Sequence, residues 1–172
     1  MEKEIYHIPA LLTESIDALN INACGSYVDA TFGGGGHSRA ILQRLGPAGH
    51  LYGFDRDLDA LRNAPDDSRF TFVHSDYRFI PNFLHYYGCD KADGILADLG
   101  VSFHHFDSGE RGFSFREDAP LDMRMNRKGE RTAAQIIADA SPEILESIFR
   151  AYTDLKRPRL LANAIVKARS AS

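Results

Sequence analysis

The sequence lacks the features that mark membrane, secreted and metal-binding chains. No apolar run approaches the roughly 20 residues that a membrane-spanning helix needs. Residues 1–4 have neither the basic nor the apolar region of a secretion signal. The two cysteines, Cys24 and Cys89, match no metal-ligand spacing. We therefore expect a cytoplasmic protein with reduced thiols, without membrane association and without a metal.

Internal repeats and low-complexity segments are also missing. The composition, 44% hydrophobic and 26% charged over 172 residues, is that of one ordinary globular domain with room for a small appendage. Charge is unevenly distributed. Residues 1–109 contain 8 Lys and Arg against 15 Asp and Glu, whereas residues 110–172 contain 12 against 9. A basic second part hints at an anionic partner, although a solvated surface with no partner has the same appearance.

Helix-like and strand-like patterns alternate over the first hundred residues, beginning with an apolar helical stripe over residues 8–19. This order predicts an α/β fold with a parallel, doubly wound sheet. The expected strands are residues 27–32, 51–55, 70–74 and 92–99, with helices at 37–45 and 58–63. Residues 100–129 then show little periodicity, many charges and scattered aromatic residues, which predicts a long ordered loop with a functional role.

Three short helices are expected after this loop. Thr132 and Gln135 have the spacing of a capping box for the first. Ser141 and Pro142 supply a cap and a first-turn proline for the second. Pro158 begins the third, which has apolar residues on one side and basic residues on another.

A strand-like run leads directly into the glycines at residues 33–36 and then into a predicted helix. Because glycine has no Cβ atom, such a loop can turn tightly and lie close to a ligand, and the helix N-terminus favours anionic groups. Asp55 ends the next expected strand about 20 residues after Gly35, the spacing at which an acid hydrogen-bonds ribose hydroxyls. The sequence therefore predicts a nucleotide-like cofactor.

The glycine pattern departs from the dinucleotide fingerprint. Read from Gly33, the third glycine position is Ser38, and read from Gly34 it is Arg39. A cofactor with an amino-acid tail in place of a pyrophosphate needs less of that geometry, which favours S-adenosylmethionine. An NAD(P) site and a purely structural glycine turn stay open on these residues alone.

Other candidate site residues follow or lie within the expected strands. Asp98 ends the fourth, at the edge where open α/β sheets bind ligands, although a loop cap is the plain alternative. Asp29, within the first, is placed to orient the glycine loop. Tyr77, after the third, is placed to lie against a purine, or to pack without a ligand. The pair His104 and His105 has no third ligand at useful spacing, so zinc is not expected.

Taken together, these motifs make the chain resemble the bacterial 16S ribosomal RNA cytosine-N4 methyltransferases. The resemblance covers nearly the whole chain and rests on six blocks. Two of them, ERGFSF and PLDMRM, have no generic explanation in the fold, so their joint presence is specific. The blocks are residues 7–12 (HIPALL), 29–38 (DATFGGGGHS), 53–57 (GFDRD), 93–102 (DGILADLGVS), 110–115 (ERGFSF) and 120–125 (PLDMRM).

By position, the resemblance implies a Rossmann-like fold that binds S-adenosylmethionine. The implied cofactor-binding residues are Gly35, Gly36, His37, Asp55, Tyr77, Asp98 and His105. The first three are expected at the methionine end of the cofactor, Asp55 at the ribose and Tyr77 near the adenine. Asp98 and His105 are expected to complete the pocket, although the family often has a glutamine where this chain has His105.

The resemblance also implies that the three short helices begin an inserted helical domain that helps to bind 16S rRNA in the small ribosomal subunit; a homodimer is left open. Basic residues in or near the helices agree with this role: Lys156, Arg157, Arg159, Lys167 and Arg169. Relatives run to roughly twice a single-domain length. We therefore expect a cofactor-binding domain with an incomplete sheet over residues 1–109, an ordered loop over 110–131 and the start of the helical domain over 132–172.

The implied reaction is methyl transfer to the exocyclic N4 amine of a cytosine. The lone pair of this amine is delocalised, so the enzyme must hold amine and methyl sulfonium in line, roughly 3 Å apart, and accept developing charge. Asp98 is the candidate catalytic residue for that task. Candidates for stacking on the unstacked base are Phe103, Phe113 and Phe115, and for phosphate contacts Arg111, Arg116 and Arg124. Core packing and ordinary surface exposure are the alternatives for these side chains.

Two other hypotheses stay open. One is a methyltransferase for a different amine, in a small molecule or a DNA base. The other is a non-catalytic fragment that binds cofactor or RNA.

Overall fold

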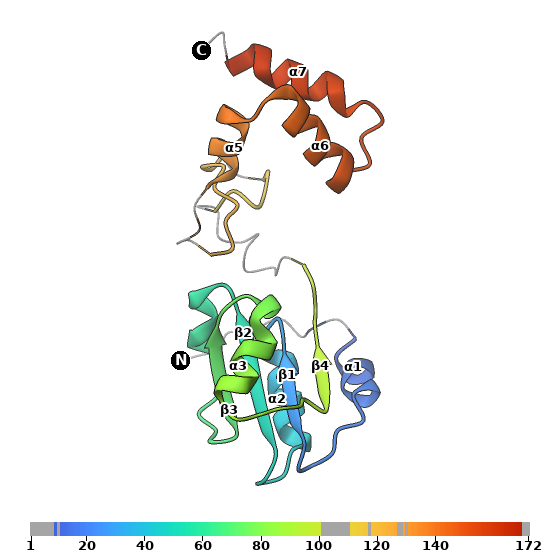
Figure 1. Cartoon of the computed structure of the whole chain (residues 1–172), viewed down its shortest axis with the longest axis vertical. Coiled ribbons are helices and arrows are strands. Elements are labelled where there is room, and N and C mark those ends of the chain that lie inside the picture. Colours follow the sequence, from blue (N-terminus) through green and yellow to red (C-terminus); the bar gives the residue numbers. More distant parts are fainter. Residues whose placement is uncertain are drawn as a thin grey trace. The chain divides into compact units, whose positions relative to one another are not determined.

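The chain is described here from a computed structural model (Figure 1). The described residues are 9, 11–100, 111–116, 118–126, 129 and 131–169. The chain divides into two compact units, Met1–Phe103 and His104–Ser172, called the first and the second unit below. The predicted boundary at residue 109 lies outside the described residues.

The first unit is built on a four-stranded parallel sheet with the strand order β3-β2-β1-β4. The strands are β1 (Ser26–Asp29), β2 (His50–Asp55), β3 (Phe70–His74) and β4 (Gly94–Leu96). Val28 of β1 lies beside Tyr52 of β2 and Ile95 of β4. Because all pairs are parallel, the carboxyl ends of the strands meet at one edge of the sheet, where ligands bind in open α/β folds. The predicted α/β architecture is confirmed.

Helices cover both faces of this sheet (Figure 1), since successive strand residues point to opposite sides. One core cluster joins strand residues to α1 (Leu12–Ala18) and α2 (Gly36–Arg44). Its buried members are Ile16, Tyr27, Ile41, Leu42, Leu45, Leu51 and Leu96. The other joins the opposite strand faces to α3 (Ile80–Tyr86). Its members are Val28, Ala30, Tyr52, Phe54, Val73, Ile80 and Leu84. These two layers hold the carboxyl edge of the sheet in place.

The observed elements differ from the predicted ones in length and in one helix. The predicted helix over 58–63 is the 3₁₀ helix η1 (Leu58–Asn63), and β3 matches its prediction, while β1 and β4 are shorter than expected. Neither α3 nor the 3₁₀ helix η2 (Tyr77–Phe79) before it is among the elements predicted from the sequence. α3 has seven residues, with Ile80 and Leu84 buried against the sheet.

The second unit contains three helices among its described residues: α5 (Ala133–Asp139), α6 (Pro142–Tyr152) and α7 (Pro158–Arg169). The predicted capping box is present, because Gln135 N–H donates to Thr132 Oγ1 at 3.1 Å and Thr132 N–H donates to Gln135 Oε1 at 2.9 Å. Ala140, Leu145 and Ala162 form a small core between the helices. No helix in the described parts of the chain is long and apolar enough to cross a membrane.

Candidate functional site

The glycine loop between β1 and α2 needs at least two of its glycines for steric reasons. Gly35 caps α2 with a φ of 73°, the left-handed region that favours glycine. A Cβ atom on Gly36 would lie 2.5 Å from Cγ of Pro9, closer than real contacts allow. The bare backbone is thus required by the packing around the loop as well as by any ligand.

Side chains from three neighbouring elements, β2, η1 and α2, hold this loop in shape. Asp55, the last residue of β2, accepts a 2.7 Å hydrogen bond from Gly33 N–H through Oδ2 and a 2.8 Å bond from Asp57 N–H through Oδ1. Asn63, at the end of η1, donates through Nδ2 to the Gly33 carbonyl at 2.9 Å. Arg39 donates through Nη1 to the Gly34 carbonyl at 2.7 Å. The predicted ribose anchor Asp55 therefore also positions the loop backbone.

Asp29 fixes both ends of the glycine loop through hydrogen bonds. Its side chain is fully buried, with Oδ1 accepting from Thr31 N–H at 3.1 Å and Oδ2 accepting from Ser38 Oγ at 2.7 Å. Burial raises the pKa of this carboxyl, while the bonds from Ser38 and Thr31 oppose the rise. The sequence pattern places Asp29 in the middle of an expected strand. It instead ends β1, where its bond to Thr31 accompanies the turn into the glycines.

His37 has a buried polar atom that is a candidate contact for a ligand. The residue is 6% exposed at the start of α2, and its Nε2 atom is buried without a hydrogen-bond partner in the described structure. Buried polar groups are rarely left unsatisfied. An unsatisfied ring nitrogen in the first turn after a glycine loop fits a nucleoside cofactor with a polar amino-acid tail.

Two more predicted residues lie past the same edge of the sheet. Tyr77 begins η2 after β3, with 47% of its surface exposed. Asp98 follows β4 by two residues, and its N–H donates to Thr31 Oγ1 at 2.7 Å, which ties the segment after β4 to the segment after β1. Gly35, Gly36 and His37 lie where the loop after β1 enters α2, so the described candidates all come from the carboxyl ends of strands or from the segments that follow them. His105 lies outside the described residues, as does Phe103.

The described residues contain no group of three His, Cys, Asp or Glu side chains arranged to hold a metal ion.

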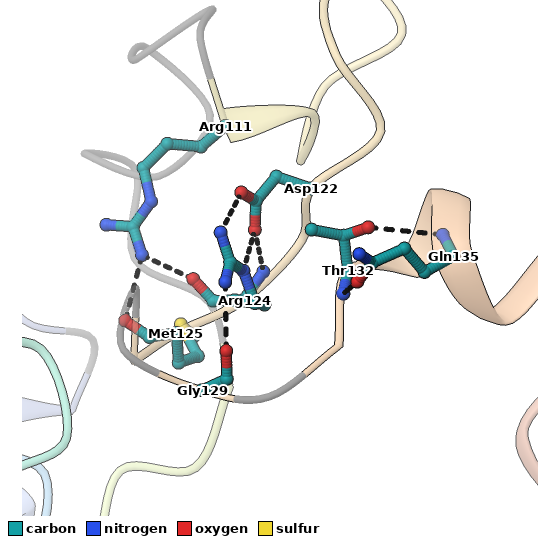
Figure 2. Close-up of polar contacts among 7 residues, drawn as sticks. All are labelled: Arg111, Asp122, Arg124, Met125, Gly129, Thr132 and Gln135. Atoms are coloured by element: carbon teal, nitrogen blue, oxygen red, sulfur yellow. Dashed lines mark hydrogen bonds and ion pairs between the residues drawn. The ribbon is translucent and has the colours of Figure 1, made fainter.

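The loop before α5 in the second unit is braced by two arginines (Figure 2). Arg111 is buried and donates through Nη2 to the carbonyls of Arg124 and Met125, at 2.7 and 2.9 Å. Arg124 donates to both carboxylate oxygens of Asp122 at 2.7 Å and through Nη1 to the Gly129 carbonyl at 2.9 Å. The phosphate role considered for Arg111 and Arg124 thus competes with a structural role inside the loop.

The aromatic candidates of this loop separate into two kinds. Phe113 lies with its ring centroid 5.5 Å from the Arg111 guanidinium carbon, as a cation–π partner. Phe115 is fully exposed, at 101% of its reference surface, so core packing does not explain it. Of the two, Phe115 is the ring that is exposed for stacking with a ring outside the protein, such as a nucleobase.

The basic residues of the helical segment differ in their contacts with the rest of the segment. Arg159 pairs with Glu143 and Glu146, at 3.1 and 3.0 Å. Arg169 donates to the carbonyls of Ile137 and Ala140 at the end of α5. Lys156, Arg157 and Lys167 are exposed. These three are the better candidates for contacts with an anionic partner.

Sequence reasoning missed several residues that build the site. Asn63, Arg39 and Thr31 hold the glycine loop or the segment after β4 through single hydrogen bonds. Thr31 lies two residues before the first glycine of the loop, so its place in the motif gives a local signal. Asn63 reaches a carbonyl 30 positions away, and nothing in its local sequence points to that partner.

A parallel sheet with a glycine loop after β1 and an acid ending β2 has the architecture of α/β methyltransferases. The chain belongs to the MraW methylase family, whose model matches residues 4–172. This confirms the family resemblance predicted from the sequence.

Curated relatives similar to this chain carry the name ribosomal RNA small subunit methyltransferase H. The relative from Phocaeicola vulgatus is 59% identical over 97% of this chain and 55% of its own length. The relative from Bacteroides thetaiotaomicron is 57% identical over 99% of this chain and 57% of its own length. The chain thus spans little more than half the length of these relatives.

Among solved structures, a putative methyltransferase from an antibiotic biosynthesis pathway of Anabaena variabilis is similar over 40% of this chain and 28% of its own. The identity is 17% and the TM-score 0.34.

Proposed function

We propose that this chain is the cofactor-binding part of an S-adenosylmethionine-dependent methyltransferase that acts on small-subunit ribosomal RNA in the cytoplasm. The target is the exocyclic N4 amine of a cytosine. The observation that carries the proposal is the glycine loop, whose backbone is fixed by Asp55 and Asp29 at the carboxyl edge of the sheet. Family membership and the names of the relatives support the class of reaction and the class of substrate.

Each candidate residue is assigned to one part of the cofactor. Gly35, Gly36 and His37 hold the methionine end, where the orphaned Nε2 of His37 would gain a partner. Asp55 holds the ribose from the end of β2, where it also fixes the glycine loop through its bond from Gly33 N–H. Tyr77 lies against the adenine. The bound cofactor supplies an electrophilic methyl group on a sulfonium.

Asp98 is the candidate acceptor for charge on the attacking amine. Its backbone N–H is fixed by Thr31, while the residue is exposed beyond the end of β4. A carboxylate at that position can accept a hydrogen bond from the amine as it becomes tetrahedral. Asp98 and His105 also complete the cofactor pocket in this proposal, so a cofactor contact competes with the catalytic role of Asp98.

The substrate must present its cytosine unstacked, because the N4 amine of a stacked base is not accessible to the methyl group. The exposed ring of Phe115 is a candidate to stack on an unstacked base of the RNA. Lys156, Arg157 and Lys167 are available for phosphate contacts, which position RNA without reading its sequence.

Two measurements test the proposal in sequence. Calorimetric titration with S-adenosylmethionine and with its demethylated product tests the cofactor site, and the absence of binding to both contradicts it. Transfer of labelled methyl groups to assembled small subunits, compared with free ribosomal RNA and with DNA, tests the substrate. Transfer to DNA or to a small amine favours the alternative substrate, and cofactor binding without any transfer favours a binding fragment.

A further inference from the structure

Three segments of the chain share one local geometry, which we call the Asp-x-Arg clasp. In each, an aspartate accepts hydrogen bonds from both the backbone N–H and the guanidinium of the arginine two residues later. The bonds from the N–H measure 2.9, 2.9 and 3.1 Å, so the backbone turn is nearly the same in all three. The clasps are Asp67-Ser68-Arg69, Asp76-Tyr77-Arg78 and Asp122-Met123-Arg124, the last of them drawn in Figure 2.

The clasp at Asp76 differs from the other two in its position and in a second arginine. It follows β3 directly, at the carboxyl edge of the sheet where the cofactor candidates gather. Oδ2 of Asp76 lies 3.2 Å from Nη2 of Arg78 and 3.4 Å from Nε of Arg56. Arg56 is the residue after the ribose candidate Asp55, and its carbonyl lies 3.1 Å from Nε2 of His74. Asp76 therefore joins the ends of β2 and β3.

Asp76 also determines the backbone on which Tyr77 stands. Its carbonyl accepts a 3.0 Å hydrogen bond from Phe79 N–H, and its side chain caps η2. The carboxylate is 13% exposed, whereas Tyr77 is half-exposed. Partial burial by itself would raise the pKa of Asp76, but the bonds from Arg78 and the two guanidinium charges lower it overall, so the carboxylate stays ionised at neutral pH.

We propose that Asp76 is a positioning residue for the adenine end of the cofactor. It holds the η2 turn so that the ring of Tyr77 is presented at the carboxyl edge, and its ion pair with Arg56 anchors this turn to the end of β2. The proposal rests on the cofactor site proposed above. It adds a residue that does not touch the cofactor and acts through Tyr77.

A double-mutant cycle on cofactor affinity tests the role. S-adenosylhomocysteine is titrated into the wild-type chain, Asp76→Ala, Tyr77→Ala and the double variant. Asp76→Ala is expected to weaken binding about fivefold, the scale of one lost helix-cap hydrogen bond. In the Tyr77→Ala background the same substitution is expected to change affinity by less than about twofold, the usual scatter of additive free energies.

Two further variants separate positioning from general damage. Asp76→Asn keeps an oxygen for the Arg78 N–H and is expected to recover most of the affinity. Asp67→Ala removes a clasp of the same geometry just before β3, at the other edge of the sheet, and is expected to leave affinity unchanged. Thermal unfolding of each variant checks that it is folded at the titration temperature.

The outcomes are distinguishable. If the wild-type chain does not bind S-adenosylhomocysteine, the proposed function fails and the role of Asp76 fails with it. If the wild-type chain binds but Asp76→Ala weakens affinity by the same factor in the Tyr77→Ala background as in the wild type, only the positioning role is overturned. The same holds if Asp67→Ala weakens binding as much as Asp76→Ala does.

Discussion

Asp29 and Ser38 form a buried pair, with Ser38 Oγ donating to Asp29 Oδ2 at 2.7 Å and both side chains fully removed from solvent. The pair joins the end of β1 to the first turn of α2, on either side of the glycine loop. A carboxylate in this position is costly, because burial disfavours its charged form and raises its pKa. Its two hydrogen bonds offset part of that cost and fix the loop.

Substituting Asp29 separates its charge from its hydrogen bonds. Asp29→Asn keeps an oxygen for Thr31 N–H and a polar group beside Ser38, without a buried charge, and is expected to be at least as stable as the wild type at pH 7. Asp29→Ala leaves the buried Ser38 hydroxyl without its acceptor and is expected to cost about 1–3 kcal/mol. Urea unfolding measures both, and an equal loss in the two variants would show that the charge itself is required.

The pH dependence of this pair has a definite sign. The folded pKa of Asp29 lies above its ordinary value of 3.8, so between the two values the native state binds a proton that the unfolded state has released. The stability contributed by this group therefore falls as pH rises through that window. Asp29→Asn removes the dependence, and its stability advantage over the wild type should grow from pH 4 upwards and then level off.

Asp67 is expected to behave in the opposite way. Hydrogen bonds from the side chain and backbone of Arg69 lower the pKa of Asp67 to about 2. This group contributes stability that is fully present above its ordinary pKa of 3.8 and is lost as pH falls through about 2. Acid unfolding of Asp67→Asn should therefore show a shallower fall in stability below pH 4 than that of the wild type. Parallel acid curves for the two proteins would contradict the assigned pKa.

Asp55→Ala is expected to weaken cofactor binding by more than about 1 kcal/mol, the scale of a lost buried hydrogen bond. The substitution removes the ribose acceptor and also releases Gly33 N–H. Asp59→Ala is a suitable control, because Asp59 pairs with Arg62 on the exposed side of η1. Calorimetry with S-adenosylhomocysteine gives both values. Unchanged affinity in Asp55→Ala would show that the ribose lies elsewhere.

Local signals predicted much of the fold and part of the site. The capping box of Thr132 and Gln135 needs only residues three apart, and it forms as expected. The glycine loop and the acid at the end of β2 were likewise predicted from spacing alone. Each of these features is determined by backbone geometry within one element or one turn, so the sequence carries it directly.

The remainder depends on contacts between distant segments. Arg159 and Arg169 look like RNA-binding residues in the sequence, yet the fold brings Glu143, Glu146 and the last carbonyls of α5 to them. α3 is held against the sheet by Ile80 and Leu84, through contacts with strand residues that are distant in the sequence. Pairings of this kind appear only once the elements are placed.

Arg111→Ala is expected to loosen the loop before α5. Arg111 is buried, and without its guanidinium the carbonyls of Arg124 and Met125 lose a charged donor, at a local cost of about 1.5–3 kcal/mol. Hydrogen–deuterium exchange across residues 111–126 should rise, while exchange in α6 and α7 stays unchanged, because those helices have their own core. Arg116→Ala is the matched control, since Arg116 is exposed in the same loop. Equal hydrogen–deuterium exchange of the loop in Arg111→Ala and Arg116→Ala would contradict the bracing role of Arg111.

Phe115→Ala tests the loop as a contact for RNA. Because the ring is fully exposed, its loss should leave the unfolding midpoint of the chain unchanged. Stacking on a nucleobase contributes about 1–3 kcal/mol, so binding of small-subunit ribosomal RNA should weaken by roughly five- to a hundredfold if the ring stacks on an unstacked base. Phe115→Tyr keeps an aromatic face and should bind as the wild type does. Tyr152→Ala removes an aromatic ring that is 83% exposed at the end of α6 and serves as the control. Equal RNA binding by Phe115→Ala and the wild type would exclude stacking on this ring and leave its exposure without a role in substrate binding.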